Sequence, residues 1–384
     1  MYPIKGSMNA RNTTLRRAIK IAVPLMTILV AVSIAGCSWF SSAKAPAPKP
    51  VVQAAAPKPI TCPLCGLPAD PALLARRPVA VKIENDPAAR PQSGLDKACV
   101  VYEEQCEGGV TRFAAVYLDR EASSVGPVRS ARPADIEIAF PYNALLCHCG
   151  GGAPILAIIR ASGIADLDEQ NHAAAYYRSR DRRAPHNLYS TTAALRQAGN
   201  AAYAHQGQAA PAFKFLTDAE QAKMESERSA EISRDAANQA NPKPGFQPSM
   251  APVSNLHLPY EPICVVDYKY DSSSGRFMRF VSGVPQVDKT TGGQLAADTV
   301  IVQYVNSTPS GLVDVEGADT PNLGLIGSGK AQVFVRGRMI DATWKKASRT
   351  DYTTYTDSAG KQIPVKPGTT WVELLPSSWQ ATFN

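Results

Sequence analysis

The hydrophobic pattern of this chain changes once, across a polar stretch at residues 216–252, and this change most constrains the fold. Before it, short apolar runs of strand type alternate with helical segments, which is typical of an α/β layer with a mixed sheet. After it, apolar residues recur with a period of two between turn signals, which indicates antiparallel strands. We therefore predict an α/β first domain over 60–215 and a smaller, mainly antiparallel β domain over 253–384.

Local patterns predict the individual elements. In the first domain we expect strands at 78–84, 110–118 and 144–149, and helical segments at 96–107, 133–140 and 154–161. In the second we expect strands at 263–270, 276–281, 299–305, 332–336, 338–344 and 369–374. Turn residues at 271–275, 336–338 and 357–360 predict hairpins between them. Residues 217–240 are polar, so they are expected to form a solvated helix or a mobile insertion.

The amino-terminal residues predict an export signal. A basic start is followed by an apolar run at 21–32, which has signal-peptide length and is too short for a typical membrane span. Small residues then precede Cys37, as in a bacterial lipobox. The expectation is a signal peptide over 1–36 and a lipid on Cys37, the alternative being a plain membrane anchor. The mature protein would be extracytoplasmic and lipid-anchored to the bacterial membrane.

Composition separates a tether from the folded part. Residues 37–59 are rich in Ala, Pro and Lys, which favours an extended tether over a packed core. The formal net charge of +7 comes from eight basic residues and no acid before residue 60, so 60–384 carries about −1. A nearly neutral folded part lacks the basic surface that nucleic-acid binding requires, and that class of function is excluded.

Residues 126–133 stand out because they place Arg129 and Arg132 three positions apart after a strand-like run. The Gly-Pro pair at their start predicts a turn, and Pro133 suits a first helical turn whose cap would be Ser130. Free backbone N–H groups and two guanidinium groups suit a phosphate or carboxylate. The alternative is that both arginines pair with internal acids such as Glu103, Glu104 or Glu107.

We expect the loops at the strand ends of the α/β layer to gather binding residues on one concave surface. The residues predicted to line it are Arg90, Arg112, Arg129, Arg132, His186 and Asn187.

The cysteines leave several alternatives open. With Cys37 lipidated, seven thiols remain, at Cys62, Cys65, Cys99, Cys106, Cys147, Cys149 and Cys264. Two pairs, Cys62-x-x-Cys65 and Cys147-x-Cys149, admit a four-thiolate zinc site or redox chemistry. Export instead favours disulfides or free buried thiols, with at least one thiol unpaired. Neither a metal nor a cofactor is therefore expected. Cys99 and Cys106 would share one face of the predicted helix.

Four motifs, in order, give the chain a family resemblance: residues 90–95, 107–113, 126–133 and 185–189. They resemble the YerB-like lipoproteins, and the similarity resumes over about 262–376. The resemblance implies two domains of unknown function and no catalytic residues that can be carried over. Several of the cysteines depart from the family pattern, so thiol chemistry common to the family is not implied.

Besides a thiol-redox or zinc protein built on the two cysteine pairs, two classes of function remain. The first is a non-catalytic envelope lipoprotein that binds a partner, such as a peptidoglycan synthase, since no serine-hydrolase or zinc-protease motif is present. The second is a phosphate-handling enzyme or polyprenyl-phosphate binder, because the order of arginines and a Gly-rich turn resembles the LytR-CpsA-Psr glycopolymer transferases. Its general bases would be sought among Glu84, Asp86, Glu103 and Glu104.

Overall fold

The computed structural model describes residues 59–204, 209–238, 250–260, 263–314 and 317–384. The predicted signal peptide, the predicted lipidation site at Cys37 and most of the predicted tether lie outside these residues. Among the described residues, no helix combines the length and the apolar composition needed to cross a bilayer.

The first segment alternates strands and helices, as its pattern predicts. Its main elements are α1 (Pro71–Leu74), β1 (Val79–Glu84), β2 (Val100–Gln105), β3 (Thr111–Tyr117), α2 (Pro133–Ala139), β4 (Leu145–His148), α3 (Ala153–Ser162), β5 (Asp166–Asp168), β6 (Tyr176–Arg178), β7 (Leu188–Ser190) and α4 (Thr192–Ala202). The mixed sheet follows from the pairing of β1, which is antiparallel to β3 and parallel to β4.

The second segment is mostly strand, joined to the first through the polar helix α5 (Asp218–Asn238). Its strands are β8 (Met250–Pro252), β9 (Asn255–Leu258), β10 (Val266–Asp271), β11 (Arg276–Val281), β12 (Val284–Pro285), β13 (Ala296–Ala297), β14 (Thr299–Val313), β15 (Asp319–Gly324), β16 (Gly327–Val335), β17 (Arg338–Lys346), β18 (Thr354–Thr356), β19 (Thr370–Pro376) and β20 (Thr382–Phe383). Most pair antiparallel, and the predicted turn at 336–338 joins β16 to β17, with Arg336 and Gly337 both at positive φ.

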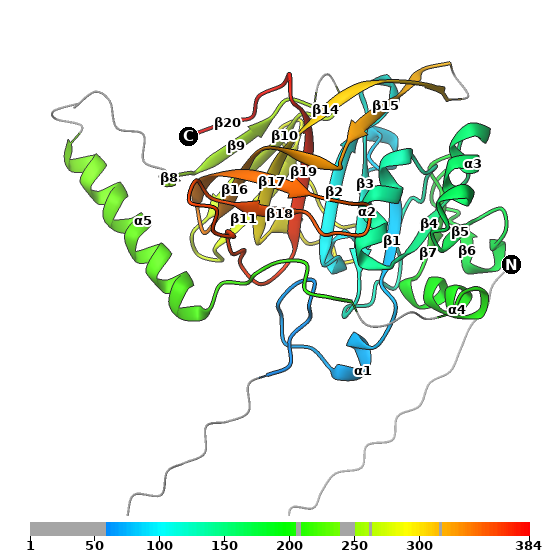
Figure 1. Ribbon diagram of the computed structural model, residues 1–384, viewed down its shortest axis with the longest axis horizontal. Helices are drawn as coiled ribbons and strands as arrows, with labels where there is room; N and C mark the ends of the chain where they lie inside the picture. Colours follow the sequence, from blue (N-terminus) through cyan, green and yellow to red (C-terminus); the bar gives the residue numbers. More distant parts are fainter. Residues whose placement is uncertain (1–58, 205–208, 239–249, 261–262, 315–316) are drawn as a thin grey trace, which may run out of the picture. The chain divides into compact units, whose positions relative to one another are not determined.

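One sheet contains strands from both segments. Its order is β18-β17-β16-β14-β19-β2-β3-β1-β4-β5, with β15 on β14 and β8 on β17. Strand β19, near the carboxyl end of the chain, lies between β14 and β2 and is parallel to both, as Figure 1 shows. The six-stranded sheet, in contrast, is built only from β9–β13 and β20.

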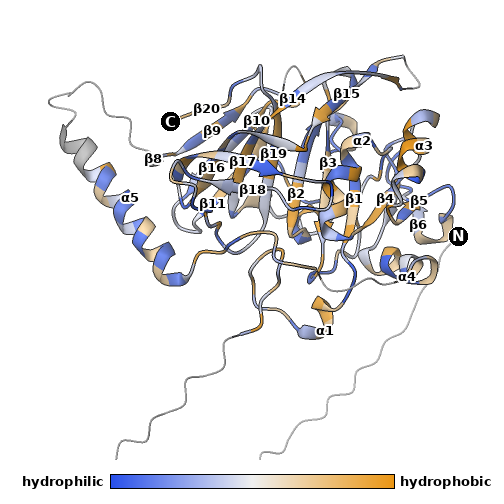
Figure 2. Cartoon of the chain, in the orientation of Figure 1, coloured by the Kyte–Doolittle hydropathy of each residue, from blue (hydrophilic) through white to orange (hydrophobic). Residues whose placement is uncertain are grey.

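Both faces of the large sheet are covered, so its central strands are apolar on both sides. Residues of β2 alternate between two cores: Val100 packs toward Ile136 of α2 and Ile159 of α3, whereas Val101 packs toward the six-stranded sheet, including Phe277. Figure 2 accordingly shows the strands of the first segment largely in the colours of apolar residues.

The predicted helix at 96–107 is wrong. Residues 100–105 form β2, which pairs with β3 on one side and β19 on the other. The misleading feature is a pair of acids, Glu103 and Glu104, that break an otherwise apolar run but are both buried. Each faces a different core, where Arg279 and Lys82 neutralise them respectively. Cys99 and Cys106 consequently lie at opposite ends of a strand and share no helix face.

Candidate functional site

A cleft of about 410 Å³ opens where the ends of β1 and β3 meet the loops that follow β2, β3 and β4. It is lined by Glu84, Asp86, Glu107, Gly108, Val110, Thr111, Arg112, Arg129, Ser130, Arg132, Gly151, Gly152, Ile155, Ile263, Asp314 and Ala318. We refer to it as the arginine cleft, after Arg112, Arg129 and Arg132. These three are among the six residues predicted to share a concave surface.

Residues 126–133 reach the cleft because part of this segment pairs with the end of β1, beyond the last residue of β1 that pairs with β4. Strand β4 pairs with β1 only as far as Val81. Beyond it, the N–H of Glu84 donates to the Pro127 carbonyl at 2.9 Å, and the N–H of Arg129 donates to the Lys82 carbonyl at 3.0 Å. Backbone pairing therefore holds the chain that carries Arg129 and Arg132 against the sheet.

Arg132 is bound to an internal acid. Its Nε lies 2.5 Å from Oε1 of Glu107 and its Nη2 lies 2.6 Å from Oε2, and the Thr320 hydroxyl donates to the same carboxylate. Burial alone would raise the pKa of Glu107, but the hydrogen bonds and charge of Arg132 outweigh it and lower that pKa. The alternative of an internal ion pair therefore holds for this arginine.

The start of α2 differs from the prediction. Arg132, not Ser130, occupies the cap position, and its backbone N–H donates to Asp135 Oδ2 at 2.6 Å. The Ser130 carbonyl instead accepts a hydrogen bond from Nη1 of Arg112 at 3.1 Å. Because Pro133 and Asp135 already satisfy the start of this short helix, an anion would be held here by side chains rather than by a free helix end.

Arg129 and His186 meet at one carboxylate. Nε of Arg129 forms an ion pair with Oε1 of Glu84 at 2.9 Å, while Nδ1 of His186 lies 3.0 Å from Oε2. Glu84 lines the cleft and His186 does not, so the imidazole acts on the cleft only through Glu84. About a quarter of the Arg129 side chain is exposed (25%), which leaves part of its guanidinium accessible.

Arg112 differs from the other two arginines. It lies on β3 directly opposite Glu84 on β1 and Glu104 on β2. Glu84 is already paired with Arg129, and Glu104 is paired with Lys82. Within the described part of the chain, Arg112 has no carboxylate at ion-pairing distance, and its polar contact is the Ser130 carbonyl.

A buried charge network lies beneath Arg112. Nζ of Lys82 bonds both Glu104 and Asp135, the latter at 2.8 Å. Burial raises the pKa of Glu104 to about 7 although the charge of Lys82 opposes the rise. Burial by itself lowers the pKa of Lys82, and the two carboxylates reverse the effect and raise it. All three side chains are buried and none of them lines the cleft, so this network offers the cleft no accessible group.

Arg90 and Asn187, like His186, do not line the cleft, so three of the six predicted residues lie outside it. Nη2 of Arg90 donates to the Asn85 carbonyl at 2.7 Å and contacts the Cys264 sulfur at 3.0 Å. Asn187 bonds Arg178 and the Ser179 carbonyl in the turn beside β6 and β7. Both side chains hold loops in place, as turn residues commonly do.

The sequence analysis missed the contribution of the second segment to the cleft. Ile263, Asp314 and Ala318 line it, and Thr320 completes the partners of Glu107. No local signal marks these residues, because they come from separate places in the chain: Ile263 precedes β10, whereas Asp314, Ala318 and Thr320 lie in or beside the β14–β15 pair.

The four-thiolate interpretation of the cysteines is wrong. Cys62 and Cys65 lie near Cys99 and Asp119, whereas Cys147 and Cys149 lie in and after β4 in other surroundings. The Cys149 thiol faces Glu169 at 3.8 Å, and burial raises the pKa of the Cys147 thiol. None of the seven described cysteines is part of a disulfide.

Comparisons with known proteins agree with this fold. Residues 64–204 match the family model "Protein of unknown function (DUF3048) N-terminal domain", and residues 256–372 match the corresponding C-terminal domain. The Bacillus subtilis (strain 168) protein "Putative lipoprotein YerB" is 28% identical over 324 residues, covering 83% of this chain and 87% of that protein. A crystal structure of YerB from Bacillus subtilis superposes with a TM-score of 0.69 at 24% identity, covering 85% of this chain and 99% of that one.

Proposed function

The chain belongs to the DUF3048 family of proteins of unknown function, and on this premise we propose that it is a membrane-anchored extracytoplasmic lipoprotein with a non-catalytic binding or regulatory role. It binds a cell-envelope component through the arginine cleft. The family relationship to a protein named as a lipoprotein supports the anchor, as do the lipobox-like residues ending at Cys37.

The observation that carries the proposal is the unequal pairing of the three arginines. Arg132 is bound at two nitrogens by Glu107, and Arg129 is paired with Glu84. Both are therefore held rigidly as part of the wall. Arg112 keeps guanidinium nitrogens that no described carboxylate satisfies. A guanidinium in a preformed polar cleft binds a carboxylate or phosphate with two parallel hydrogen bonds.

Cross-linking in living cells tests this proposal with the full-length chain. A photoreactive benzoylphenylalanine replaces Ala318 at the cleft, and a matched control carries it at Ile158, which is exposed on α3 outside the cleft. We expect a reproducible envelope adduct from position 318 only. Arg112→Gln should lower its yield about tenfold, because a hydrogen bond between charged groups contributes about 1.5–3 kcal/mol. Arg178→Gln, on exposed β6, should leave it unchanged.

Two outcomes would count against a binding cleft. One is the absence of any adduct from position 318 in a stably folded chain. The other is an adduct whose yield does not respond to Arg112→Gln.

The second candidate is a phosphate-handling enzyme or polyprenyl-phosphate binder, favoured by the convergence of three arginines on one cleft. The four carboxylates that also line the cleft, from Glu84, Asp86, Glu107 and Asp314, oppose it, since they repel a multiply charged pyrophosphate more strongly than a singly charged anion. Calorimetric titration of the full-length chain with pyrophosphate and with a polyprenyl phosphate in detergent separates the two. Binding that Arg112→Gln abolishes, together with turnover of the lipid, would favour the enzyme.

A further inference from the structure

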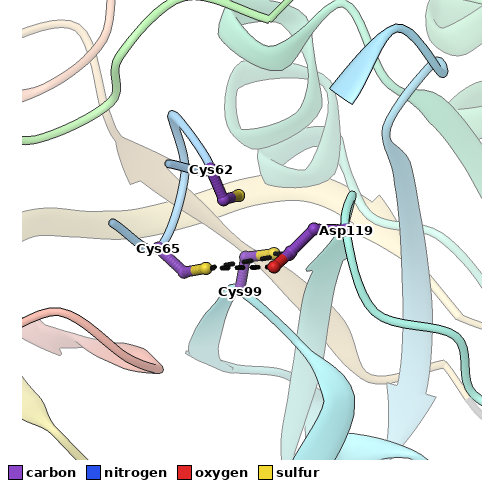
Figure 3. Close-up of side chains that lie close together, drawn as sticks. All are labelled: Cys62, Cys65, Cys99 and Asp119. Carbon is purple, nitrogen blue, oxygen red and sulfur yellow. Dashed lines mark hydrogen bonds between the residues drawn. The ribbon is translucent and has the colours of Figure 1, made fainter. Parts of the chain in front are cut away.

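Far from the arginine cleft, three cysteines and one aspartate converge on a single point. Sγ of Cys62, Sγ of Cys65, Sγ of Cys99 and a carboxylate oxygen of Asp119 all lie within 4.8 Å of one another. The three thiols are fully buried, and Asp119 is 8% exposed. Figure 3 shows the four side chains directed toward one another from three separate parts of the chain.

Two structural features build this cluster. Cys62 and Cys65 lie in a tight turn, in which the Gly66 N–H donates to the Cys62 carbonyl and the Cys62 N–H donates to the Leu67 carbonyl, each at 2.8 Å. Gly66 has a φ of +69°, which bends the chain back after Cys65. Such a turn places two sulfur atoms on one side of the loop, as a Cys-x-x-Cys metal ligand pair requires.

The other two groups come from the sheet. Cys99 immediately precedes β2, and Asp119 lies two residues after β3. Strands β2 and β3 are antiparallel, with Val100 opposite Val116. The start of β2 and the end of β3 therefore lie side by side, at the same end of this strand pair. The backbone N–H of Cys99 bonds the Val116 carbonyl at 2.8 Å, which fixes the position of its sulfur.

The distances between ligand atoms fit a tetrahedral ion. Sγ of Cys99 lies 3.0 Å from Oδ1 of Asp119, and Sγ of Cys65 lies 3.5 Å from Oδ2. Zinc bonds to sulfur and oxygen in a tetrahedron imply S···O separations of roughly 3.5 Å and S···S separations of roughly 3.8 Å. Small side-chain movements within the 4.8 Å cluster would reach this geometry.

The charge balance of the cluster also favours a bound cation when its four acidic groups are ionised. Four acidic groups share the site, and the neighbouring cation is Arg120, whose Nε is 4.0 Å from Asp119 Oδ1. With all four groups ionised, Arg120 alone would leave a buried charge of about −3, which a divalent ion would reduce to about −1.

We propose that Cys62, Cys65, Cys99 and Asp119 bind one Zn²⁺ ion as a closed structural site. Three thiolates and one carboxylate supply all four positions, so no coordination site is left for a substrate. The ion would fasten the first described turn to the edge of the sheet. It would act together with two backbone bonds to that turn, from Ala212 N–H to the Pro63 carbonyl at 3.1 Å and from Gly368 N–H to the Cys65 carbonyl at 2.8 Å.

Metal analysis of the full-length chain, purified in detergent without chelators, tests the site. We expect about one Zn²⁺ per chain by mass spectrometry, and three thiols that resist alkylation until the metal is removed. Cys99→Ser should lose the ion. Cys149→Ser is the matched control, because it also removes one thiol facing a carboxylate but lies outside the cluster.

Because Cys99→Ser could fail to fold, a second measurement uses the unmodified sequence. The chain stripped of metal under reducing conditions is titrated with Co²⁺. Intense visible bands of a tetrahedral cobalt thiolate should develop and saturate near one equivalent, and Zn²⁺ should then displace them.

Either of two results would overturn the proposal. One is a metal-free chain in which peptide mapping finds a disulfide within the cluster and the reduced chain gives no tetrahedral cobalt spectrum. The other is zinc retained equally by Cys99→Ser and Cys149→Ser, which would place the ion elsewhere.

Discussion

Arg132 and Glu107 face each other fork to fork, with the two nitrogen–oxygen distances at 2.5 and 2.6 Å. Thr320 of β15 donates a third hydrogen bond to Glu107, so a residue of the second segment completes a pair formed within the first. This arrangement makes Arg132 part of the wall of the cleft and leaves Arg112 as the cation with unused hydrogen-bonding capacity.

Arg132→Gln should therefore act mainly on stability. The substitution leaves Glu107 buried without its cation, and such losses cost about 3–5 kcal/mol. Arg112→Gln breaks one bond to a backbone carbonyl and should cost at most about 1.5 kcal/mol. Urea denaturation of both variants measures the difference, and equal losses would show that the two arginines have the same role.

A second buried ion pair joins the two segments through the core. Arg279 of β11 bonds Glu103 of β2 and, at 3.1 Å, Glu373 of β19. Burial and the charge of Glu103 raise the pKa of Glu373 well above its usual range. Arg279 also lies closer to Glu103 than to Glu373, so Glu103 is its main counter-ion.

Glu103→Gln should accordingly cost more than Glu373→Gln. The first removes the counter-ion of a fully buried guanidinium, at about 3–5 kcal/mol. The second introduces a neutral group of similar shape where the raised pKa already disfavours the charged form of the carboxyl, at about 1 kcal/mol. Denaturant midpoints at pH 7 measure both, and a larger loss for Glu373→Gln would mean that Glu373 carries the charge.

His148 makes stability depend on pH. It is fully buried, with Nε2 2.7 Å from Asp166 and Nδ1 2.9 Å from the Gly150 carbonyl. Burial alone would lower the pKa of His148, but the bond and charge of Asp166 outweigh it and raise that pKa. A raised pKa means that the folded state binds the proton more tightly than the unfolded state does.

The resulting stabilisation is complete below the unfolded pKa of about 6.5 and is lost as the pH rises through the folded value. The stability of the wild type should thus fall, relative to His148→Gln, from about pH 6.5 upward. Urea unfolding from about pH 5.5 to about pH 9 measures this. His257→Gln, at a largely exposed pair with Asp267, is the control and should run nearly parallel to the wild type. Parallel curves for His148→Gln would contradict the prediction.

Two effects disfavour a side chain at Gly66, its positive φ and the close approach of Phe215, and a matched pair of variants separates them. Its φ is +69°, and a Cβ there would lie 2.6 Å from the Phe215 ring. Gly108 has a similar φ of +66° but nothing within 4 Å of a Cβ. Gly108→Ala should cost about 1 kcal/mol through backbone strain alone. Gly66→Ala should cost about 1–3 kcal/mol more through overpacking, and equal thermal midpoints would refute the clash.

Features that depend on near neighbours in the chain could be predicted from the amino-acid pattern. The period of apolar residues located β1, β3, β4, α2 and α3 of the first segment and most strands of the second, since hydrophobic periodicity is a local property. The family motifs were equally readable, as was the placement of Arg129 and Arg132 on one turn. All of these rest on residues within a few positions of one another.

The contacts between residues far apart in the sequence could not be predicted and became visible in the tertiary structure. Residues 100–105 form a strand because β3 and β19 flank them, and the buried acids within them have cations on other elements. Arg132 forms an ion pair with Glu107, 25 residues away in the sequence, and the Cys65 sulfur contacts Asp119, 54 residues away. Burying a charged or polar side chain is unfavourable unless it meets a partner. Strand order and register decide which partner it meets, and the local sequence does not specify either of them.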